Sequence, residues 1–172
     1  MQIRALREAD DRSRFHSGDP DLDRFLLRFA GQNQFRHYVG VTYVAVDDSG
    51  ILGFATVAPG HVEIEGLPLA ERKKVPRYPL PVLRLARLAV DRSFQRQGLG
   101  ARILRFVLQL AERMAADFGC VGVVVDAKPE AIGFYTQYGF MALEAVMGRS
   151  EARPQPIPLF LAMRAIKGAV KG

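Results

Sequence analysis

The sequence predicts a single α/β domain over residues 1–172, in which a central mixed sheet is flanked by helices. Predicted strands and helices alternate through much of the chain, and one strand–turn–helix–strand unit occupies residues 83–125. The length of 172 residues suits one domain with its own core. Hydrophobic residues make up 49% and charged residues 24%, which argues against a disordered or fibrous protein.

The first third of the chain contains a helix between strands. We expect strands at residues 3–6, 41–46 and 51–57 and a helix at residues 20–34. Asp19 caps this helix and Pro20 fits its first turn, because the first amides of a helix have no partner within it. Apolar residues at intervals of three and four predict one buried face, made by Leu22, Phe25, Leu26 and Phe29. Asp-Asp-Ser-Gly at residues 47–50 predicts a hairpin turn.

A proline-rich connection at residues 59–81 precedes the most informative strand. Connections of this length are usually functional or mobile, and residues 67–74 are compatible with a short helix. In the strand at residues 83–90, apolar side chains alternate on one parity at first and on the other parity later. Such a reversal is what a β-bulge near Ala86 and Arg87 produces. The residues that show it are Leu83 and Leu85, then Leu88 and Val90.

The second half continues with a long helix and a closing pair of strands. An apolar face predicts a helix at residues 100–118, and the apolar run at residues 121–125 is typical of a parallel strand buried on both faces. A further helix is expected from Pro129 to Tyr138, with Gly139 at its end. Residues 140–146 and 158–164 are predicted to pair as antiparallel strands, and residues 167–172 to form a frayed tail.

A glycine turn, Gln95-Arg96-Gln97-Gly98-Leu99-Gly100, lies between the strand at residues 83–90 and the long helix. Its glycines let the backbone approach a ligand closely, and the start of the helix presents unpaired amides to an anion. Ile103 stands where a dinucleotide fingerprint has its third glycine, and no Gly-Lys-Ser/Thr of a P-loop follows. The turn therefore predicts a phosphate-binding loop of another kind.

The chain is basic, with 24 Lys and Arg residues against 18 Asp and Glu residues and a net charge of +6. Arginine accounts for 19 of the 24 basic residues, and its guanidinium suits bidentate contacts with phosphate. This balance favours an anionic partner such as CoA or a nucleic acid. Solvated arginines from a biased amino-acid usage would give the same charge, so the charge alone leaves both interpretations open.

Cysteine and histidine usage argues against disulfides and metal sites. Cys120 is the single cysteine, which excludes an internal disulfide, and its place in an apolar strand predicts a core residue. The three histidines, His16, His37 and His61, have no metal-ligand spacing, so no metal is expected. No apolar stretch is long enough to span a bilayer, and the first residues lack the apolar core of a signal peptide. We therefore expect a cytoplasmic protein without membrane contact.

Two motifs together resemble the GNAT acyltransferase superfamily. The family's pyrophosphate motif, Gln/Arg-x-x-Gly-x-Gly/Ala, is matched by Gln95, Gly98 and Gly100, and its Phe-Tyr-x-x-x-Gly-Phe signature is matched at residues 134–140. The resemblance implies the GNAT fold, with acetyl-CoA or another acyl-CoA held between two splayed parallel strands. The residues that it assigns to the cofactor are Leu88, Ala89, Val90, Gln95, Arg96, Gln97, Gly98, Leu99, Gly100 and Phe134. A turn whose glycines serve only sterically is the alternative.

The resemblance also assigns proton donation to Tyr135, whose phenol holds its proton at neutral pH. The alternative role is a core aromatic residue that lines the cofactor cleft. The strand at residues 83–90 contains no Asp or Glu and so supplies no general base. An α-amine, with a pKa of about 7.7–8.0, is partly neutral without a base, whereas a lysine amine near 10.4 is not. An α-amino acceptor is therefore favoured, although water, His37 or His61 would also serve as base.

The N-terminal residues resemble one branch of the superfamily, the TacT-type toxins that acetylate aminoacyl-tRNA. Residues 15–19, Phe-His-Ser-Gly-Asp, and residues 22–26, Leu-Asp-Arg-Phe-Leu, match the branch's Phe-x-Cys-Gly and Leu-Asp-x-Phe-Leu pattern. Residues 85–91 match its Leu-Ala-Arg-Leu-Ala-Val-Asp strand, whereas Ser17 replaces its cysteine and residues 148–158 have no match. The resemblance implies the α-amine of aminoacyl-tRNA as acceptor, a homodimer, and a small ribbon-helix-helix antitoxin as partner.

Basic side chains would contact the tRNA in this interpretation. The candidates are Arg36, Arg72, Lys73, Lys74, Arg77 and Arg92. Arg92 and Arg96 equally suit the phosphates of CoA, and the charged run at residues 71–74 equally suits a solvated turn. Two other functions remain open: acetylation of a small-molecule amine or a protein N-terminus, and a silent module that only binds acyl-CoA.

Overall fold

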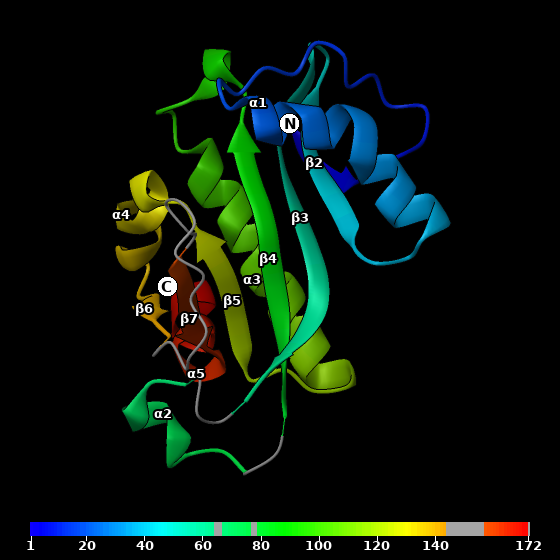
Figure 1. Ribbon diagram of the computed structural model, residues 1–172. Helices are drawn as coiled ribbons and strands as arrows, with labels where there is room; N and C mark the ends of the chain where they lie inside the picture. Colours follow the sequence, from blue (N-terminus) through cyan, green and yellow to red (C-terminus); the bar gives the residue numbers. More distant parts are fainter. Residues whose placement is uncertain (64–66, 77–78, 144–156, 172) are drawn as a thin grey trace, which may run out of the picture. The chain divides into compact units, whose positions relative to one another are not determined.

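Seven strands form a mixed sheet in the order β1-β2-β3-β4-β5-β7-β6, and helices flank the strands (Figure 1). This computed structural model describes residues 1–63, 67–76, 79–143 and 157–171, and it confirms the predicted fold class. The chain divides into two compact units. The first consists of residues 1–58 and 85–107, and the second consists of residues 59–84 and 108–172.

The strands agree with the predicted order, and four of them are longer than predicted, two of these by three residues or more. Their bounds are β1 Gln2–Ala5, β2 Val41–Asp47, β3 Gly50–Val62, β4 Leu80–Val90, β5 Gly122–Ala127, β6 Met141–Ala142 and β7 Ile157–Ala162. The helices are α1 Pro20–Arg24, η1 Phe25–Phe29, η2 Gln32–Arg36, α2 Leu69–Arg72, η4 Arg92–Phe94, α3 Leu99–Asp117, η5 Pro129–Ala131, α4 Ile132–Thr136 and α5 Met163–Lys171. Because β3 extends to Val62 and β4 begins at Leu80, the two ends of the proline-rich stretch belong to strands, and α2 is the short helix expected within it.

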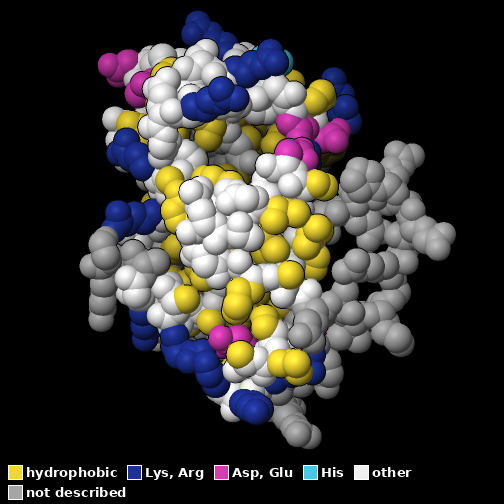
Figure 2. Space-filling model, turned by 90° about the vertical axis from the view of Figure 1, so that its left-hand side faces the viewer, with side chains coloured by type: hydrophobic (Ala, Val, Ile, Leu, Met, Phe, Trp, Pro, Cys, Tyr) yellow, Lys and Arg dark blue, Asp and Glu magenta, His cyan; other side chains and the backbone are white. Residues whose placement is uncertain are grey.

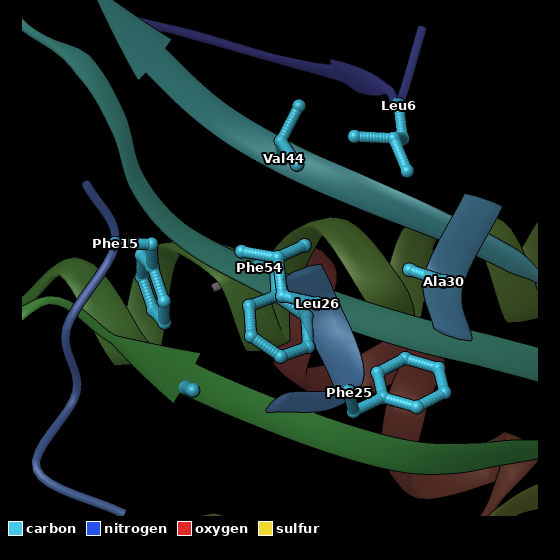
Figure 3. Packing of buried hydrophobic residues seen from close by; sticks show 8 residues of the cluster. Leu6, Phe15, Phe25, Leu26, Ala30, Val44 and Phe54 are labelled. Atoms are coloured by element: carbon cyan, nitrogen blue, oxygen red, sulfur yellow. The ribbon is translucent and has the colours of Figure 1, made fainter. Parts of the chain in front are cut away.

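The first unit packs its helices against a strand hairpin. β2 pairs antiparallel with β1 and with β3, and the hairpin turn at Asp48-Ser49 confirms the prediction. Buried hydrophobic side chains from these strands, the N-terminal segment and the helix form one cluster around Phe54 (Figure 3). The cluster consists of Leu6, Phe15, Phe25, Leu26, Ala30, Val44, Phe54 and Ala89. The ring centroids of Phe15 and Phe25 lie 5.4 and 6.3 Å from that of Phe54, so aromatic packing fixes the N-terminal segment on the hairpin.

The helix predicted at residues 20–34 is present but changes its geometry. α1 continues into two π-helical segments, and the Ala30 amide donates to the Phe25 carbonyl, five residues earlier. Such a turn takes one residue more than an α-helical turn. Ala30 therefore faces the core, at the place where apolar spacing of three and four residues predicts Phe29. Phe29 is 44% exposed, and the prediction that it lies on the buried face was wrong.

The second unit is built on β5, β7 and β6. β7 pairs antiparallel with both β5 and β6, which confirms the predicted closing pair over the described residues. A Cβ atom at Gly122 would overlap the Leu161 carbonyl and the Phe160 ring, so only glycine fits there. The frayed tail predicted at residues 167–172 was wrong over the described residues, because α5 follows β7 and extends to Lys171.

Burial along β4 also differs from the prediction. Val82 and Leu83 are buried in succession, so burial does not simply alternate along the strand, and the bulge near Ala86 and Arg87 stays a prediction. Near the end of the strand Ala89 is buried, whereas Leu88 and Val90 are only partly buried. The reason is local packing, since Ala89 joins the cluster around Phe54.

Candidate functional site

The glycine turn between β4 and α3 has the backbone that its sequence predicts. Gly98 adopts a φ of +82°, and no heavy atom lies within 4 Å of the position that a Cβ would take there. The glycine is therefore required by the backbone and not by crowding, and the space beside it is open. Arg96 also has a positive φ, +62°, which is uncommon for a residue with a side chain. The helix after the turn begins at Leu99, one residue earlier than predicted.

The side chain of Gln95 closes this turn. Its Nε2 atom donates hydrogen bonds to the Val90 carbonyl at 2.9 Å and to the Ser17 carbonyl at 2.8 Å. One bond joins the two ends of the turn, and the other ties the turn to the N-terminal segment. The glutamine of the pyrophosphate motif thus fixes the backbone of the turn.

The N-terminal segment supports the turn through Asp91 and His16. The Asp91 carboxylate accepts hydrogen bonds from the His16 amide at 3.0 Å and the Ser93 amide at 2.9 Å. The Arg92 amide donates to the His16 carbonyl at 2.8 Å, and the Asp91 amide donates to the Leu52 carbonyl at 2.8 Å. The sequence indicates this segment only as a family motif and does not reveal its contact with the turn. The signal available was Asp-x-Ser directly after a strand, which is typical of an aspartate that caps a turn.

Ser17, which departs from the branch's cysteine, takes part in a local hydrogen-bond network. Its hydroxyl donates to Asp23 Oδ1 at 2.6 Å, and its amide donates to the same oxygen at 2.9 Å. The other carboxylate oxygen of Asp23 lies 3.3 Å from His16 Nδ1. The serine therefore holds the segment in place through hydrogen bonds.

The last residues of β4 lie close to β3 in the first unit. A Cβ atom at Gly53 would lie 3.0 Å from the Ala89 carbonyl and 2.7 Å from Ile103, so this glycine lets the strand approach closely. The Arg87 guanidinium lies 3.7 Å above the Phe25 ring, and burial lowers the pKa of Arg87. β4 carries two basic residues and no carboxylate, as the sequence indicates.

Tyr135 belongs to the second unit and is held by aromatic packing. Its ring centroid lies 5.1 Å from that of Phe134 and 5.4 Å from that of Phe140, both in edge-on contact. Tyr135 is 5% exposed, and this burial raises its pKa above the ordinary tyrosine value. The phenol is therefore fully protonated at neutral pH. Gly139, with a φ of +95°, ends the turn after α4 and returns the chain to Phe140.

Several predicted tRNA contacts are engaged in bonds within the second unit. Arg72 Nε donates to the Leu67 carbonyl at 3.0 Å, and Lys74 Nζ lies 4.0 Å from the Glu71 carboxylate. Glu71 also accepts two hydrogen bonds from Arg164, at 2.8 and 3.1 Å. Lys73 is exposed, and Arg77 lies outside the described residues. Arg36, Arg92 and Arg96 are exposed in the first unit.

Basic side chains are visible at several separate places on the face drawn in Figure 2.

Among the described residues, no three His, Cys, Asp or Glu side chains are grouped so as to hold a metal ion. No helix in the described ranges is both long and apolar enough to cross a membrane. The Cys120 thiol is buried and lies 3.2 Å from the Gly122 carbonyl, and burial raises its pKa, as expected for a core residue.

Comparison with known proteins identifies the family. Residues 39–142, more than half of the chain, match the model of the acetyltransferase (GNAT) domain. The protein therefore belongs to the GNAT family and is an acetyltransferase.

Relatives define a narrower group to which the chain is similar. It is 36% identical over 140 residues to the tRNA-acetylating toxin of Mycobacterium tuberculosis (strain ATCC 25618 / H37Rv), covering 80% of this chain and 82% of that protein. It superposes on AtaT complexed with acetyl-methionyl-tRNAfMet with a TM-score of 0.82 and 26% identity over 96% of both chains. A mutant of AtaT bound to the C-terminus of the antitoxin AtaR and acetyl-CoA gives a TM-score of 0.78 at 25% identity, over 99% of this chain and 98% of that one.

Proposed function

We propose that this acetyltransferase transfers the acetyl group of acetyl-CoA to the α-amino group of an amino acid esterified to tRNA, as the toxin of a toxin–antitoxin pair. The observation that carries the proposal is the 36% identity to a tRNA-acetylating toxin over four fifths of both chains. Structural similarity to AtaT with acetyl-methionyl-tRNAfMet supports the same acceptor. The net charge of +6 agrees with a polyanionic substrate.

The glycine turn suits the pyrophosphate of acetyl-CoA. The open space at Gly98 leaves the backbone accessible, and α3, with 19 residues, begins directly after it. We assign the amides of Gln95, Arg96, Gln97, Gly98, Leu99 and Gly100 to the phosphates, and backbone groups of Leu88, Ala89 and Val90 together with Phe134 to the rest of the cofactor. The bound cofactor supplies an activated acetyl thioester.

Tyr135 is the residue we assign to proton donation. A departing thiolate needs a group that still holds its proton at neutral pH, and the raised pKa of Tyr135 ensures this state. Phe134 and Phe140 fix the ring, so the direction of the hydroxyl is set before the substrate binds. No carboxylate stands on β4 to remove a proton from the acceptor, which favours an α-amine that is already partly neutral.

An antitoxin is the protein partner that we propose, by analogy with the AtaT mutant bound to the C-terminus of the antitoxin AtaR. We further propose that this antitoxin is a small ribbon-helix-helix protein and that the enzyme is a homodimer, which rests on the resemblance of the sequence to the TacT-type toxins. We also propose that residues 1–172 form one functional domain, because the family match spans parts of both compact units.

The test is transfer of label from radiolabelled acetyl-CoA. Purified protein is incubated with total aminoacyl-tRNA and, in parallel, with deacylated tRNA, free amino acids and a peptide with a free N-terminus. Label on charged tRNA alone is the expected result, because only this substrate combines an α-amine with the polyanion. Label on free amines or on the peptide, with none on tRNA, would establish the alternative acceptor. Binding of acetyl-CoA without any transfer would establish a silent module.

A further inference from the structure

An exposed corner follows the second π-helical segment of the first unit. Four successive residues, Arg36, His37, Tyr38 and Val39, are all exposed. Tyr38 is 84% exposed and Val39 is 58% exposed, which is unusual for an aromatic residue and its apolar neighbour in a folded domain. The ring of Tyr38 forms no contact with another ring among the described residues, so packing within the chain does not explain it.

The backbone of this corner is also unfavourable for tyrosine. Tyr38 has a φ of +55°, and apart from Arg96 no other described residue with a side chain has a positive φ. The His37 amide donates to the Gln32 carbonyl and the Val39 amide to the Asn33 carbonyl, both at 3.0 Å, which holds Tyr38 in this conformation. Glycine or asparagine normally occupies such a position after a helix. Neither the backbone nor the core therefore favours a tyrosine here.

The sequence on both sides of Tyr38 carries basic residues and no acidic residue. Residues 24–46 contain three arginines and one histidine and no Asp or Glu. Arg28 and Arg36 are exposed and form no ion pair within the part of the chain that the structure describes. The same helical segment exposes Leu27 and Phe29, at 49% and 44%. An exposed ring among unpaired guanidinium groups is the chemistry that binds unpaired bases and their phosphates.

We propose that the corner formed by Arg36, His37, Tyr38 and Val39 binds tRNA, with Tyr38 stacked on an unpaired base and Arg36 on a phosphate. The proposal rests on the proposed function, since it takes tRNA as the substrate. It assigns base stacking to a residue that the charge pattern alone does not reveal. It also places substrate contact at Arg36, which forms no ion pair among the described residues, unlike Arg72 and Lys74, which are engaged with Leu67 and Glu71.

The decisive variant is Tyr38→Asn, because asparagine tolerates a positive φ. Removal of the ring then leaves the backbone no less stable, and the thermal midpoint is expected to stay equal or rise. Affinity for tRNA, measured by fluorescence anisotropy at fixed salt, is expected to fall about 5- to 100-fold, the range for loss of one base–aromatic stack. Tyr38→Phe keeps the ring and is expected to bind tRNA as the unmodified protein does. Phe118→Ser removes another exposed ring, 74% exposed and directly after α3, and is expected to leave tRNA affinity unchanged.

A second variant tests the phosphate contact. Arg36→Gln is expected to weaken tRNA binding and to reduce the slope of log affinity against log salt by about one. Tyr38→Asn is expected to leave this slope unchanged, because stacking releases no counterion. The two variants therefore separate stacking from charge.

The outcomes distinguish this inference from the function on which it rests. If the unmodified protein neither binds nor acetylates aminoacyl-tRNA, the proposed function fails. If it acetylates aminoacyl-tRNA and Tyr38→Asn binds tRNA equally well, the corner is not a tRNA contact and only this inference fails. Light scattering gives a further check: a changed oligomeric mass of Tyr38→Asn with unchanged tRNA affinity would assign the corner to contact between copies of the chain and overturn the inference.

Discussion

The glycine turn and the tyrosine region are stabilised by opposite kinds of interaction. The turn is exposed, and hydrogen bonds that the Asp91 carboxylate accepts and the Gln95 side chain donates fix its backbone. Tyr135 is buried, and the rings of Phe134 and Phe140 fix it. The chemistry of each task explains the difference, because amides that bind phosphate must reach solvent, whereas a proton donor is kept neutral by removal from water.

The largest effect is expected for Tyr135→Phe. The variant keeps the ring and its contacts, so the free energy of unfolding should change little, while acetyl transfer to aminoacyl-tRNA should fall about 100-fold or more with loss of the proton donor. The measurement is kcat together with urea unfolding. A matched control is Tyr138→Phe, which also keeps a ring beside Phe134 and should retain activity. Retention of full activity by Tyr135→Phe would assign Tyr135 the purely structural role.

Asp91→Ala is expected to affect the turn through its support. Two backbone amides, of His16 and Ser93, lose their acceptor, which should lower the free energy of unfolding by about 2 kcal/mol and raise the KM for acetyl-CoA more than it changes kcat. Urea unfolding and steady-state kinetics measure both. Asp126→Ala is the control, because its exposed pair with Arg84 should contribute at most about 1 kcal/mol. Equal effects of the two substitutions would contradict a special role for Asp91.

Gly98→Ala tests the backbone of the turn without crowding it. No atom stands within 4 Å of the new methyl group, so the expected loss of about 1 kcal/mol comes from the φ of +82° alone. Gly168→Ala is the matched control: its surroundings are equally open, it lies in α5 and its φ is not positive, so it should stabilise by roughly 0.5–1 kcal/mol. Urea unfolding of the two variants should therefore give opposite signs. A stabilised Gly98→Ala would show that the turn does not need glycine.

Local patterns in the sequence predicted most of the fold and the turn. The positive φ of Gly98 and the end of the tyrosine region at Gly139 follow from glycine placement, and hairpin and strand order follow from hydrophobic alternation. The π-helical segments were not predictable, because a period of 3.6 residues was assumed where the chain uses a wider turn. The wider turn exposes Phe29, which the spacing places in the core. For this reason the sequence also does not predict the exposed apolar side chains of this helical segment.

Long-range hydrogen bonds were the other part that the sequence does not reveal. Gln95 reaches the carbonyl of Ser17, 78 residues earlier in the chain. Gln34 similarly donates to the Leu6 carbonyl and accepts from the Thr42 amide, so one side chain joins the helical segment to β2 and to the residue that follows β1. A glutamine has no sequence signature for such a role, because its partners are main-chain groups that every residue carries.

The smallest expected effect concerns pH and the Arg4–Asp10 pair of the first unit. Two hydrogen bonds from Arg4, at 2.8 and 2.9 Å, and one from the Arg7 amide lower the pKa of Asp10 below its ordinary value. Because the folded pKa is lower than the unfolded one, the pair stabilises the protein above the ordinary aspartate pKa of about 3.9, and this contribution is lost as the pH falls towards the folded value.

Asp10→Asn removes the charge and should therefore flatten the decline in stability of the first unit in this acid range. The free energy of unfolding, measured in urea at pH 7 and pH 3, should differ between the two pH values by less in the variant than in the unmodified protein, by at most about 1 kcal/mol. Asp48→Asn, an exposed hairpin residue, is the control and should leave the decline unchanged. The stability of the first unit around Arg4 and Asp10 would then depend on the charge of a carboxylate. The aromatic packing around Tyr135 in the second unit would not depend on such a charge.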